Sequence, residues 1–338
     1  MQRVFDRLDE LYAIGGGPGA NRPSGSAGED EAHRLATVWM REARLEVEID
    51  PDGNLIGRAA RRPEVWVGSH LDSVPHGGKF DGALGVVAAI EAVERAGAGA
   101  AVAFRGEEVG CIGSRALVAR GGRFPTAFLE LHIEQGPRLA QADAPLGVVT
   151  AIVAVARGEL VVEGRAGHAG TMPMDSREDA LVKAAEEILR IREIAHGIDG
   201  AVATVGQVEV EPGTANVIPK RVTLTVDARA PDVERCDRLV EALGLEPFYR
   251  TEPAEMSSEL RAVLRDELER RELPVVELPS GAGHDASVLA GAGVPSAMLF
   301  VRSLAGGISH SPEERSSVDD VELGVDVLTA ALARLTAA

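Results

Sequence analysis

The sequence predicts an α/β protein in which a mainly parallel sheet is flanked by helices and a smaller α+β domain is inserted. Apolar runs typical of buried strands alternate with helical segments in the first part of the chain, and another such run lies near its C-terminus. Between them lies a block in which apolar and polar residues alternate, as in an antiparallel sheet. The 338 residues also exceed one typical core, so two domains are expected.

The first domain is predicted to comprise residues 1–153 and 253–338. Residues 44–50 and 54–60 predict a hairpin around the turn Pro51-Asp52-Gly53-Asn54. Buried strands are predicted at residues 64–70, 100–108, 126–136 and 295–303, and helices at about 83–95, 114–120 and 257–271. The Gly/Pro/Ser-rich segment 15–28 predicts a surface loop.

The inserted domain is predicted to comprise residues 154–252. It is expected to contain a strand at 158–170, a helix at about 177–195, and strands at 201–210 and 221–231. The alternating pattern of these strands suits an antiparallel sheet with one exposed face.

Composition and charge limit the classes of partner. The chain is 45% hydrophobic and 26% charged, as globular proteins are. Its net charge of −18 argues against nucleic acid and anionic membranes, which would repel it. Cys111 and Cys236 are the only cysteines, so neither a disulfide framework nor a cysteine zinc site is expected. With no signal peptide and no membrane-spanning stretch apparent, a cytoplasmic protein is expected.

Acidic and imidazole side chains follow the predicted strands. Such residues at the carboxyl ends of parallel strands lie where an open α/β sheet places its active site. Histidine and carboxylate ligands suit zinc, manganese or similar ions, and there are enough for two ions if one carboxylate bridges them. An adjacent carboxylate could then serve as general base. The residues are His70, Asp72, Asp81, Glu107, Glu108, His132 and His310.

A structural interpretation competes with this one. A lone buried histidine or an acidic pair at a strand end is more often structural than catalytic. Ligand-type residues at four separate strand ends favour a metal site instead. His33, His76 and His196 have no such neighbours in the sequence, so we expect them to be structural or surface residues.

Eight motifs occur in an order that resembles the M20-type metallohydrolases. Within them the chain is similar to the N-carbamoyl-L-amino acid hydrolase and allantoate amidohydrolase branch. The motifs are GSHLDSVPHGGKFDGALGV, GEEVGCIGS, LELHIEQGP, AGHAGTMPMDSREDA, PGTANVIP, DARAP, SGAGHDA and ISHSPEE, which spread from Gly68 to Glu314. The resemblance implies a zinc-exopeptidase-like fold in which the inserted domain acts as a lid and mediates dimerisation.

The resemblance also implies roles for single residues. His70, Asp81, Glu108, His132 and His310 match the metal ligands, with Asp81 as the bridging carboxylate. Glu107 matches the general base, Asp72 the carboxylate that orients the His70 imidazole, and His168 the oxyanion-stabilising histidine. The residues that match substrate-binding positions are Gln135, Asn216, Arg229 and Gly283.

Three of these residues have ordinary structural interpretations as well. Arg229 could bind a substrate carboxylate with two parallel hydrogen bonds, or form a surface ion pair on its strand. His168 lies in a Gly-rich turn that permits close approach to a ligand but resembles any tight loop. Asn216 could simply stabilise a turn.

Two departures from the branch keep other functions open. The segment between Glu108 and the strand of His132 is short, which resembles the peptidase and aminoacylase branch. Met172 stands where the N-carbamoyl-L-amino acid hydrolase branch often has Thr.

Other functions are disfavoured by missing motifs. The SGAGHDA segment lacks the acidic residue that a dinucleotide fingerprint needs, and no nucleophile elbow occurs. The alternatives are an aminoacylase or dipeptidase on the same metal core, or a non-catalytic metal-binding homologue.

The expected reaction is hydrolysis of a carbamoyl or similar amide C–N bond by a metal-bridging water. The expected cofactors are two divalent ions per subunit, zinc or manganese first and cobalt or nickel as alternatives. The expected partners are a small anionic ureido or N-acyl amino acid substrate and, from the resemblance, a second copy of the chain bound through the inserted domain.

Overall fold

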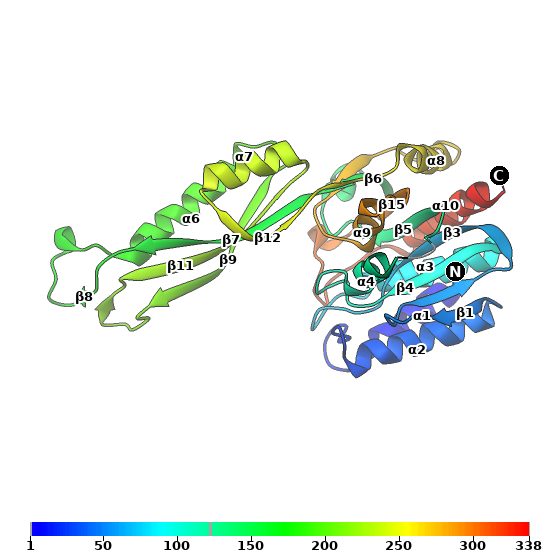
Figure 1. Cartoon of the computed structure of the whole chain (residues 1–338), viewed down its shortest axis with the longest axis horizontal. Coiled ribbons are helices and arrows are strands. Elements are labelled where there is room, and N and C mark those ends of the chain that lie inside the picture. The colour runs from blue at the N-terminus through cyan, green and yellow to red at the C-terminus, as the bar shows by residue number, and fades with distance from the viewer. Residues whose placement is uncertain (1, 122–123, 338) are drawn as a thin grey trace. The chain divides into compact units, whose positions relative to one another are not determined.

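The chain forms two compact units in a computed structural model that describes residues 2–121 and 124–337. The larger unit comprises Met1–Ile152 and Ala254–Ala338, and the smaller unit comprises Val153–Pro253 (Figure 1). The smaller unit is one residue longer at each end than the inserted range 154–252. Within the described ranges, no helix combines the length and the apolar character that crossing a membrane requires.

A mixed sheet with a parallel centre organises the larger unit. Its central strands are β4 (Ala98–Phe104), β3 (Arg61–His70), β5 (Ala127–Ile133) and β15 (Ser296–Val301), in that spatial order and all parallel. The predicted hairpin, β1 (Glu46–Ile49) and β2 (Leu55–Arg58), joins antiparallel beside β4. At the other edge β6 (Leu146–Ile152) carries β13 (Ala254–Glu255) and β14 (Glu277–Ser280). The hairpin was predicted but its antiparallel pairing with β4 was not, and β6, β13 and β14 were not predicted.

Both faces of this sheet are covered by helices, which explains why its strands are continuously apolar. One face packs against α1 (Gln2–Tyr12), α2 (Ala27–Glu42), α3 (Ala83–Ala96), α8 (Ser258–Glu269) and α10 (Val318–Thr336). The other packs against α4 (Ile112–Arg120), α5 (Arg138–Gln141) and α9 (Asp285–Gly291). A short 3₁₀ turn, η2 (Ala305–Gly307), follows β15.

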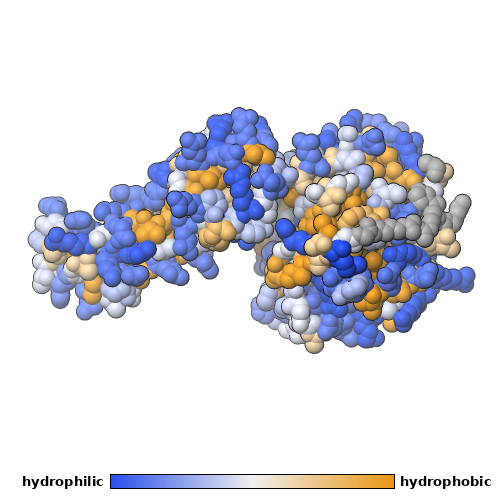
Figure 2. Space-filling view, viewed as in Figure 1, coloured by the Kyte–Doolittle hydropathy of each residue, from blue (hydrophilic) through white to orange (hydrophobic). Residues whose placement is uncertain are grey.

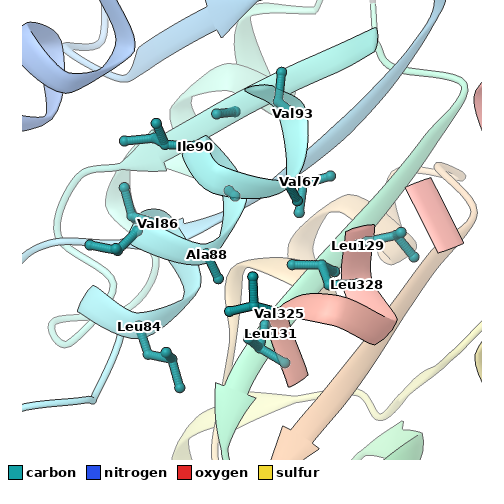
Figure 3. Close-up of a cluster of buried hydrophobic side chains, with 14 of the residues drawn as sticks. Val67, Leu84, Val86, Ala88, Ile90, Val93, Leu129, Leu131, Val325 and Leu328 are labelled. Atoms are coloured by element: carbon teal, nitrogen blue, oxygen red, sulfur yellow. The ribbon is translucent and has the colours of Figure 1, made fainter. Parts of the chain in front are cut away.

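Helix α3 lies in the centre of the larger core. Val325 and Leu328 of α10 lie beside Leu131 and Leu129 of β5 in the same cluster (Figure 3). Every α3 residue from Ala83 to Val93 is buried, and all of them except Glu91 are apolar or glycine, so only the last turn of this helix reaches solvent. It ends at Gly97, whose left-handed conformation forms the C-cap.

The smaller unit is an antiparallel sheet with two helices. The strands β12 (Glu246–Thr251), β7 (Ala154–Glu163), β11 (Arg221–Ala230) and β9 (Val202–Glu211) pair in that order. Helices α6 (Ala180–His196) and α7 (Val233–Leu243) supply its core together with inward residues of the sheet. Between β7 and β11 the chain also contains three short elements: β8 (Gly167–His168), η1 (Met174–Ser176) and β10 (Val217–Ile218). Helix α7 and strand β12 were missed by the sequence prediction.

The predicted surface loop at residues 15–28 contains a buried arginine, which the sequence analysis did not foresee. Segment 15–28 has the composition of a surface loop, but Arg22 within it is fully buried. The Arg22 guanidinium donates from Nε to Leu71 O (2.7 Å) and from Nη1 to Leu11 O (2.8 Å). These two carbonyls replace part of the water that a guanidinium would otherwise bind, and Nη2 has no hydrogen-bond partner among the described residues.

Figure 2 shows mostly hydrophilic residues with several groups of hydrophobic residues between them on the visible face. The exposed apolar side chains of the smaller unit include Leu181, Val182 and Leu189 on α6, and Val202 and Val208 on β9.

Candidate metal centre

The candidate site lies at the carboxyl edge of the four central parallel strands. His70 is the last residue of β3, and His132 lies near the end of β5. Glu107 and Glu108 follow β4, and His310 lies in the loop after β15. Because these strands are parallel neighbours, their carboxyl ends meet at one edge. Asp81 reaches the same place from the turn that precedes α3.

Asp81 is the centre of the cluster. Its Oδ1 lies 3.2 Å from Nε2 of His132 and 3.7 Å from Nε2 of His70. Its Oδ2 lies 3.2 Å from Nε2 of His310, which is in turn 3.4 Å from Oε2 of Glu108. The two carboxylate oxygens of Asp81 therefore face different sets of ligand-type atoms, as a bridging carboxylate does.

Two groups of residues that share Asp81 could each hold a divalent cation: one is His70, Asp81 and His132, all buried, and the other is Asp81, Glu108 and His310. A third group of ligand-type residues, Glu130, His132 and His284, shares His132 with the first. Within each group the ligand atoms lie within 4.8 Å of one another. Imidazole nitrogen and carboxylate oxygen suit zinc and similar ions, and a shared carboxylate suits a pair of them. The residues present therefore fit two divalent cations.

Hydrogen bonds orient the two buried imidazoles. Nδ1 of His132 lies 3.0 Å from Ile133 O, and Nδ1 of His70 lies 3.2 Å from Asp72 O and 3.3 Å from Asp72 Oδ1. When Nδ1 donates to such an acceptor, the Nε2 lone pair is left for a metal. In both residues Nε2 is the nitrogen that faces Asp81.

Asp72 also fixes the backbone of the glutamate pair. Its Oδ1 accepts from Glu107 N and its Oδ2 from Glu108 N, both at 3.1 Å. One buried carboxylate thus connects the end of β3 with the loop after β4. The position of the two glutamates relative to His70 is set by this connection.

Glu107 is a buried carboxyl beside the cluster. Its Oε2 lies 3.7 Å from His70 Nε2, and its Oε1 accepts a weak hydrogen bond from Cys111 Sγ at 3.8 Å. Burial, with the neighbouring carboxylates, raises the pKa of Glu107 well above its ordinary value, although His70 opposes the shift. A carboxyl tuned upward in this way suits proton transfer near neutral pH. Cys111 itself is a small buried residue.

Electrostatics of the second group also favour a cation. Burial and the charge of Asp81 raise the pKa of Glu108. The hydrogen bond to Asp81 raises the pKa of His310 to about 9, so this imidazole carries a proton beside two carboxylates at neutral pH. The carboxylates of Asp81 and Glu108 place two negative charges close together here. A divalent cation at the same position would neutralise them more fully than the proton on His310 does.

A glycine makes room for the cluster. The Cβ of any other residue at position 82 would lie 2.4 Å from Cε1 of His70. Gly82 also has a φ of +63°, which L-residues rarely adopt. The last residue of the HLDSVPHGGKFDG motif therefore has a steric reason to be glycine.

Two of the predicted substrate residues, Gln135 and Gly283, belong to the larger unit. Gln135 lies beside the cluster, where its Nε2 donates to Asp81 Oδ2 (3.0 Å) and to Ser309 Oγ (3.2 Å). Gly283 lies in the loop between β14 and α9, and no atom approaches within 4 Å of the place where a Cβ would stand.

The remaining predicted residues belong to the smaller unit. His168 on β8 pairs in register with Val217, and its Nδ1 accepts from Gly170 N (3.0 Å), so neutral His168 carries its proton on Nε2. Asn216 lies nearby, where its backbone O accepts from Ala169 N (3.0 Å). Arg229 lies on β11.

Arg229 forms an ion pair within its own strand. Its Nε and Nη2 contact the two oxygens of Asp227 at 2.7 and 3.3 Å, and Arg157 Nε donates to the same carboxylate at 2.6 Å. Asp227 thus holds the Arg229 guanidinium in a fixed plane, and two arginines share one aspartate.

Three further buried residues were not singled out from the sequence. Glu130 precedes His132 by two residues, so the strand period of two places both on one face, and it accepts from Ser69 Oγ (2.7 Å). The His284 ring lies 4.6 Å from the His132 ring. Asp285 accepts from Ser114 Oγ (2.6 Å), and burial raises its pKa to about 8. Strand periodicity could have identified Glu130.

The chain is similar to known proteins over nearly its whole length. The profile of peptidase family M20/M25/M40 matches residues 66–334. The N-carbamoyl-L-amino acid amidohydrolase of Geobacillus stearothermophilus is 36% identical over 396 residues, covering 97% of this chain and 96% of that protein. The allantoate amidohydrolase of Escherichia coli (strain K12) is 32% identical over 403 residues, covering 99% and 98%.

A solved structure agrees with these relatives. The amidase of the hydantoinase/carbamoylase family from Burkholderia multivorans has a TM-score of 0.90 at 30% identity, covering 98% of this chain and 97% of that chain. The sequence alignments span more positions than the 338 residues present, so the relatives contain segments that this chain lacks. Family profile, sequence identity and fold agree: the chain belongs to peptidase family M20/M25/M40.

Proposed function

We propose that this chain is a metal-dependent amidohydrolase that cleaves the carbamoyl C–N bond of an N-carbamoyl-L-amino acid. The observation that carries the proposal is the arrangement around Asp81, whose two oxygens face two ligand sets while Glu107 lies buried beside them. The names of the relatives, which give N-carbamoyl-L-amino acids and allantoate, support the ureido substrate class. N-carbamoyl-β-alanine is a further ureido acid that we propose as a related substrate.

The proposed ligands are His70, Asp81 and His132 for one ion, and Asp81, Glu108 and His310 for the other. Divalent cations held there supply Lewis acidity, which lowers the pKa of water and stabilises negative charge on a carbonyl oxygen. Zinc or manganese suits this donor set best, and cobalt or nickel are alternatives.

The residues of the chain supply the proton transfers. Glu107 would take a proton from the attacking water and deliver it to the leaving nitrogen, and its raised pKa supports both steps. His168 would donate from Nε2 to the oxygen that becomes negative, because its Nδ1 already accepts from Gly170 N. Asp72 would keep the His70 imidazole oriented. For a carbamoyl amino acid the products are the amino acid, ammonia and carbon dioxide.

Substrate binding is proposed for Gln135, Asn216, Arg229 and Gly283. An anionic substrate near so many carboxylates needs a fixed cation, and Arg229 provides one whose orientation Asp227 already holds. Asp227 competes with the substrate carboxylate for this guanidinium, whereas Arg157 shares the aspartate charge and so weakens that competition.

We also propose that the smaller unit acts as a lid and that two copies of the chain pair through it. Strand β9 is an edge strand, and Val202 and Val208 on it are exposed, as are Leu181, Val182 and Leu189 on α6. A dimer through these surfaces would cover both the open strand edge and the apolar side chains. Sedimentation of Leu189→Arg beside the wild type tests this: the variant should sediment as a monomer. A cytoplasmic location stays a prediction.

A second candidate function is that of an aminoacylase or dipeptidase. The observation in its favour is the compact segment after the glutamate pair, since α4 already begins at Ile112. A non-catalytic homologue is the third alternative, and the complete ligand set argues against it.

A two-panel assay tests the proposal. Metal-reconstituted protein is given N-carbamoyl-L-amino acids, N-carbamoyl-β-alanine and allantoate, and released ammonia is measured. In parallel, free amine is measured from N-acetyl amino acids and dipeptides. N-carbamoyl-D-amino acids and chelator-treated protein are the controls. Ammonia is expected from the N-carbamoyl-L-amino acids or from one of the two related ureido acids, and not from the N-carbamoyl-D-amino acids. Free amine only from acyl or peptide substrates would replace the proposal with the second candidate function, and fewer than one bound ion per chain would favour the non-catalytic alternative.

A further inference from the structure

We propose that Glu314 is a positioning residue that joins the loop of Asp81 to the loop of His310, and that the ion site of Asp81, Glu108 and His310 depends on it. This inference rests on the proposed two-metal centre and adds a residue that contacts neither ion. Glu314 belongs to the ISHSPEE motif, whose only assigned member so far is His310.

One buried carboxylate makes contacts on both loops. Glu314 is 4% exposed, and its Oε1 accepts from Phe80 N (2.7 Å) and Asp81 N (3.1 Å). Its Oε2 accepts from Ser309 Oγ (2.7 Å), on the residue that precedes His310. Hydrogen bonds to a charged acceptor are the stronger kind, so this carboxylate fixes the backbone of Asp81 and the approach to His310 together.

A second connection closes a ring. Gln135 Nε2 donates to Asp81 Oδ2 and to Ser309 Oγ, so the path from Glu314 through Ser309 and Gln135 returns to Asp81. The loop also fits tightly around the carboxylate: a Cβ at position 78 would lie 2.0 Å from Cδ of Glu314. Gly78 is therefore needed to admit Glu314, which explains a second glycine of the HGGKFDG segment.

The two ion sites differ in how much they need this support. His70 and His132 lie on β3 and β5, where the sheet holds their backbone. His310 lies in an irregular loop at a φ of +53°, and half of its side chain is exposed. A non-glycine residue in this conformation persists only where its surroundings fix it. Loss of Glu314 would therefore weaken the His310 site most.

Three variants test the proposal. Glu314→Ala removes all three contacts, whereas Glu314→Gln keeps an oxygen for the two N–H groups and an amide for Ser309 Oγ. Glu313→Ala is the matched control, because Glu313 is the same residue type one position earlier and is exposed. Each protein is stripped with a chelator and titrated calorimetrically with Zn²⁺ and with Mn²⁺, and its thermal unfolding is recorded.

The expected result is a selective loss. Wild type and Glu313→Ala should bind two ions per chain, and Glu314→Ala should keep one while binding the other about 10–100-fold more weakly. Glu314→Gln should bind both. Equal weakening of both ions, or none, in Glu314→Ala would overturn the proposal. If Glu314→Ala does not fold, Ser309→Ala replaces it, with the same selective loss expected and the same contrary outcome.

Hydrogen exchange of the metal-free proteins gives a readout that does not require the ions. The amides of Phe80 and Asp81 should exchange faster in Glu314→Ala than in wild type or Glu313→Ala, while amides of β3 and β5 keep their rates. Unchanged exchange at Phe80 and Asp81 would refute the positioning role. A wild type that binds a single ion would contradict the two-metal proposal, and hydrogen exchange would still decide whether Glu314 holds the two loops.

Discussion

Asp72 contacts the edge of the His70 ring that faces away from the metal centre: its Oδ1 lies 3.3 Å from His70 Nδ1. The same carboxylate is fully buried and also accepts the two N–H groups of the glutamate pair. Burial would raise the pKa of Asp72, but its hydrogen bond with His70 and the backbone N–H groups outweigh that, so the pKa is lowered. Asp72 therefore stays ionised and keeps His70 Nε2 directed at Asp81.

Replacing Asp72 by Ala is expected to reduce metal affinity by about 10–100-fold, because the His70 ring and the glutamate backbone lose their common acceptor. Asp72→Asn, which keeps one acceptor oxygen, should lose less. The measurement is calorimetric titration with Zn²⁺. Asp199→Asn is the control, since the Asp199 side chain is 97% exposed. If Asp72→Ala binds Zn²⁺ as tightly as the wild type does, Asp72 does not support the metal site.

Replacing Glu107 by Gln is expected to reduce kcat by about 10²–10⁴-fold with both ions retained, because the amide cannot accept the proton of the attacking water. Metal content and steady-state rates are measured on the same preparation. The matched comparison is Glu108→Gln, the adjacent residue, which should lose metal as well as activity. An active Glu107→Gln enzyme, or one that loses its ions, would mean that the two glutamates have been assigned the wrong way round.

The sequence was most informative where a residue's position follows from a strand. His70 and His132 lie at the ends of buried apolar runs, and two independent patterns, strand ends and motif order, point to them. Arg22 and Glu314 were missed because loop composition contains no information about a buried contact with a segment far along the chain. The orientation of Gln135 toward Asp81 depends on its left-handed backbone, with a φ of +56°, which no pattern predicted.

The smaller unit shows the same limit. Its long strands and α6 were predicted, whereas α7 was overlooked although its sequence is clearly amphipathic, and β12 contains a proline and an irregular register with β7. An edge strand tolerates proline because one side of its backbone needs no partner. These elements are held by packing onto β7 and β11, which a local pattern does not reveal.

Replacing Gly82 by Ala is expected to destabilise the protein and weaken metal binding, because the new Cβ would lie 2.4 Å from the His70 ring. Gly97→Ala is a close control: Gly97 has a φ of +62°, almost the same as Gly82, but no atom lies within 4 Å of its Cβ position. Both variants should pay the left-handed strain of about 1–2 kcal/mol. Only Gly82→Ala should also lose metal affinity, measured by titration after chelation. Equal behaviour of the two variants would show that backbone strain alone is responsible.

His33 predicts a pH dependence of stability. It is 5% exposed, and burial, with the nearby charge of Arg105, lowers its pKa to about 3. The unfolded chain, with a histidine pKa of about 6.5, then binds a proton that the folded chain does not. The contribution of neutral His33 to the free energy of unfolding is fully present above about pH 6.5. It is lost as the pH falls toward 3, by about 1.4 kcal/mol per pH unit. Between pH 7 and pH 5 the loss is about 2 kcal/mol.

Replacing His33 by Leu should remove that part of the dependence. Urea unfolding of the chelated proteins at pH 7 and pH 5 measures it, because the metal ligands titrate in the same way in both and cancel in the difference. The variant should lose about 2 kcal/mol less than wild type on acidification, whatever its stability at pH 7. His196→Leu is the control, since His196 is exposed and should leave the difference unchanged. Parallel pH dependences of wild type and His33→Leu would mean that His33 is protonated in the folded protein, and that its burial does not keep it neutral.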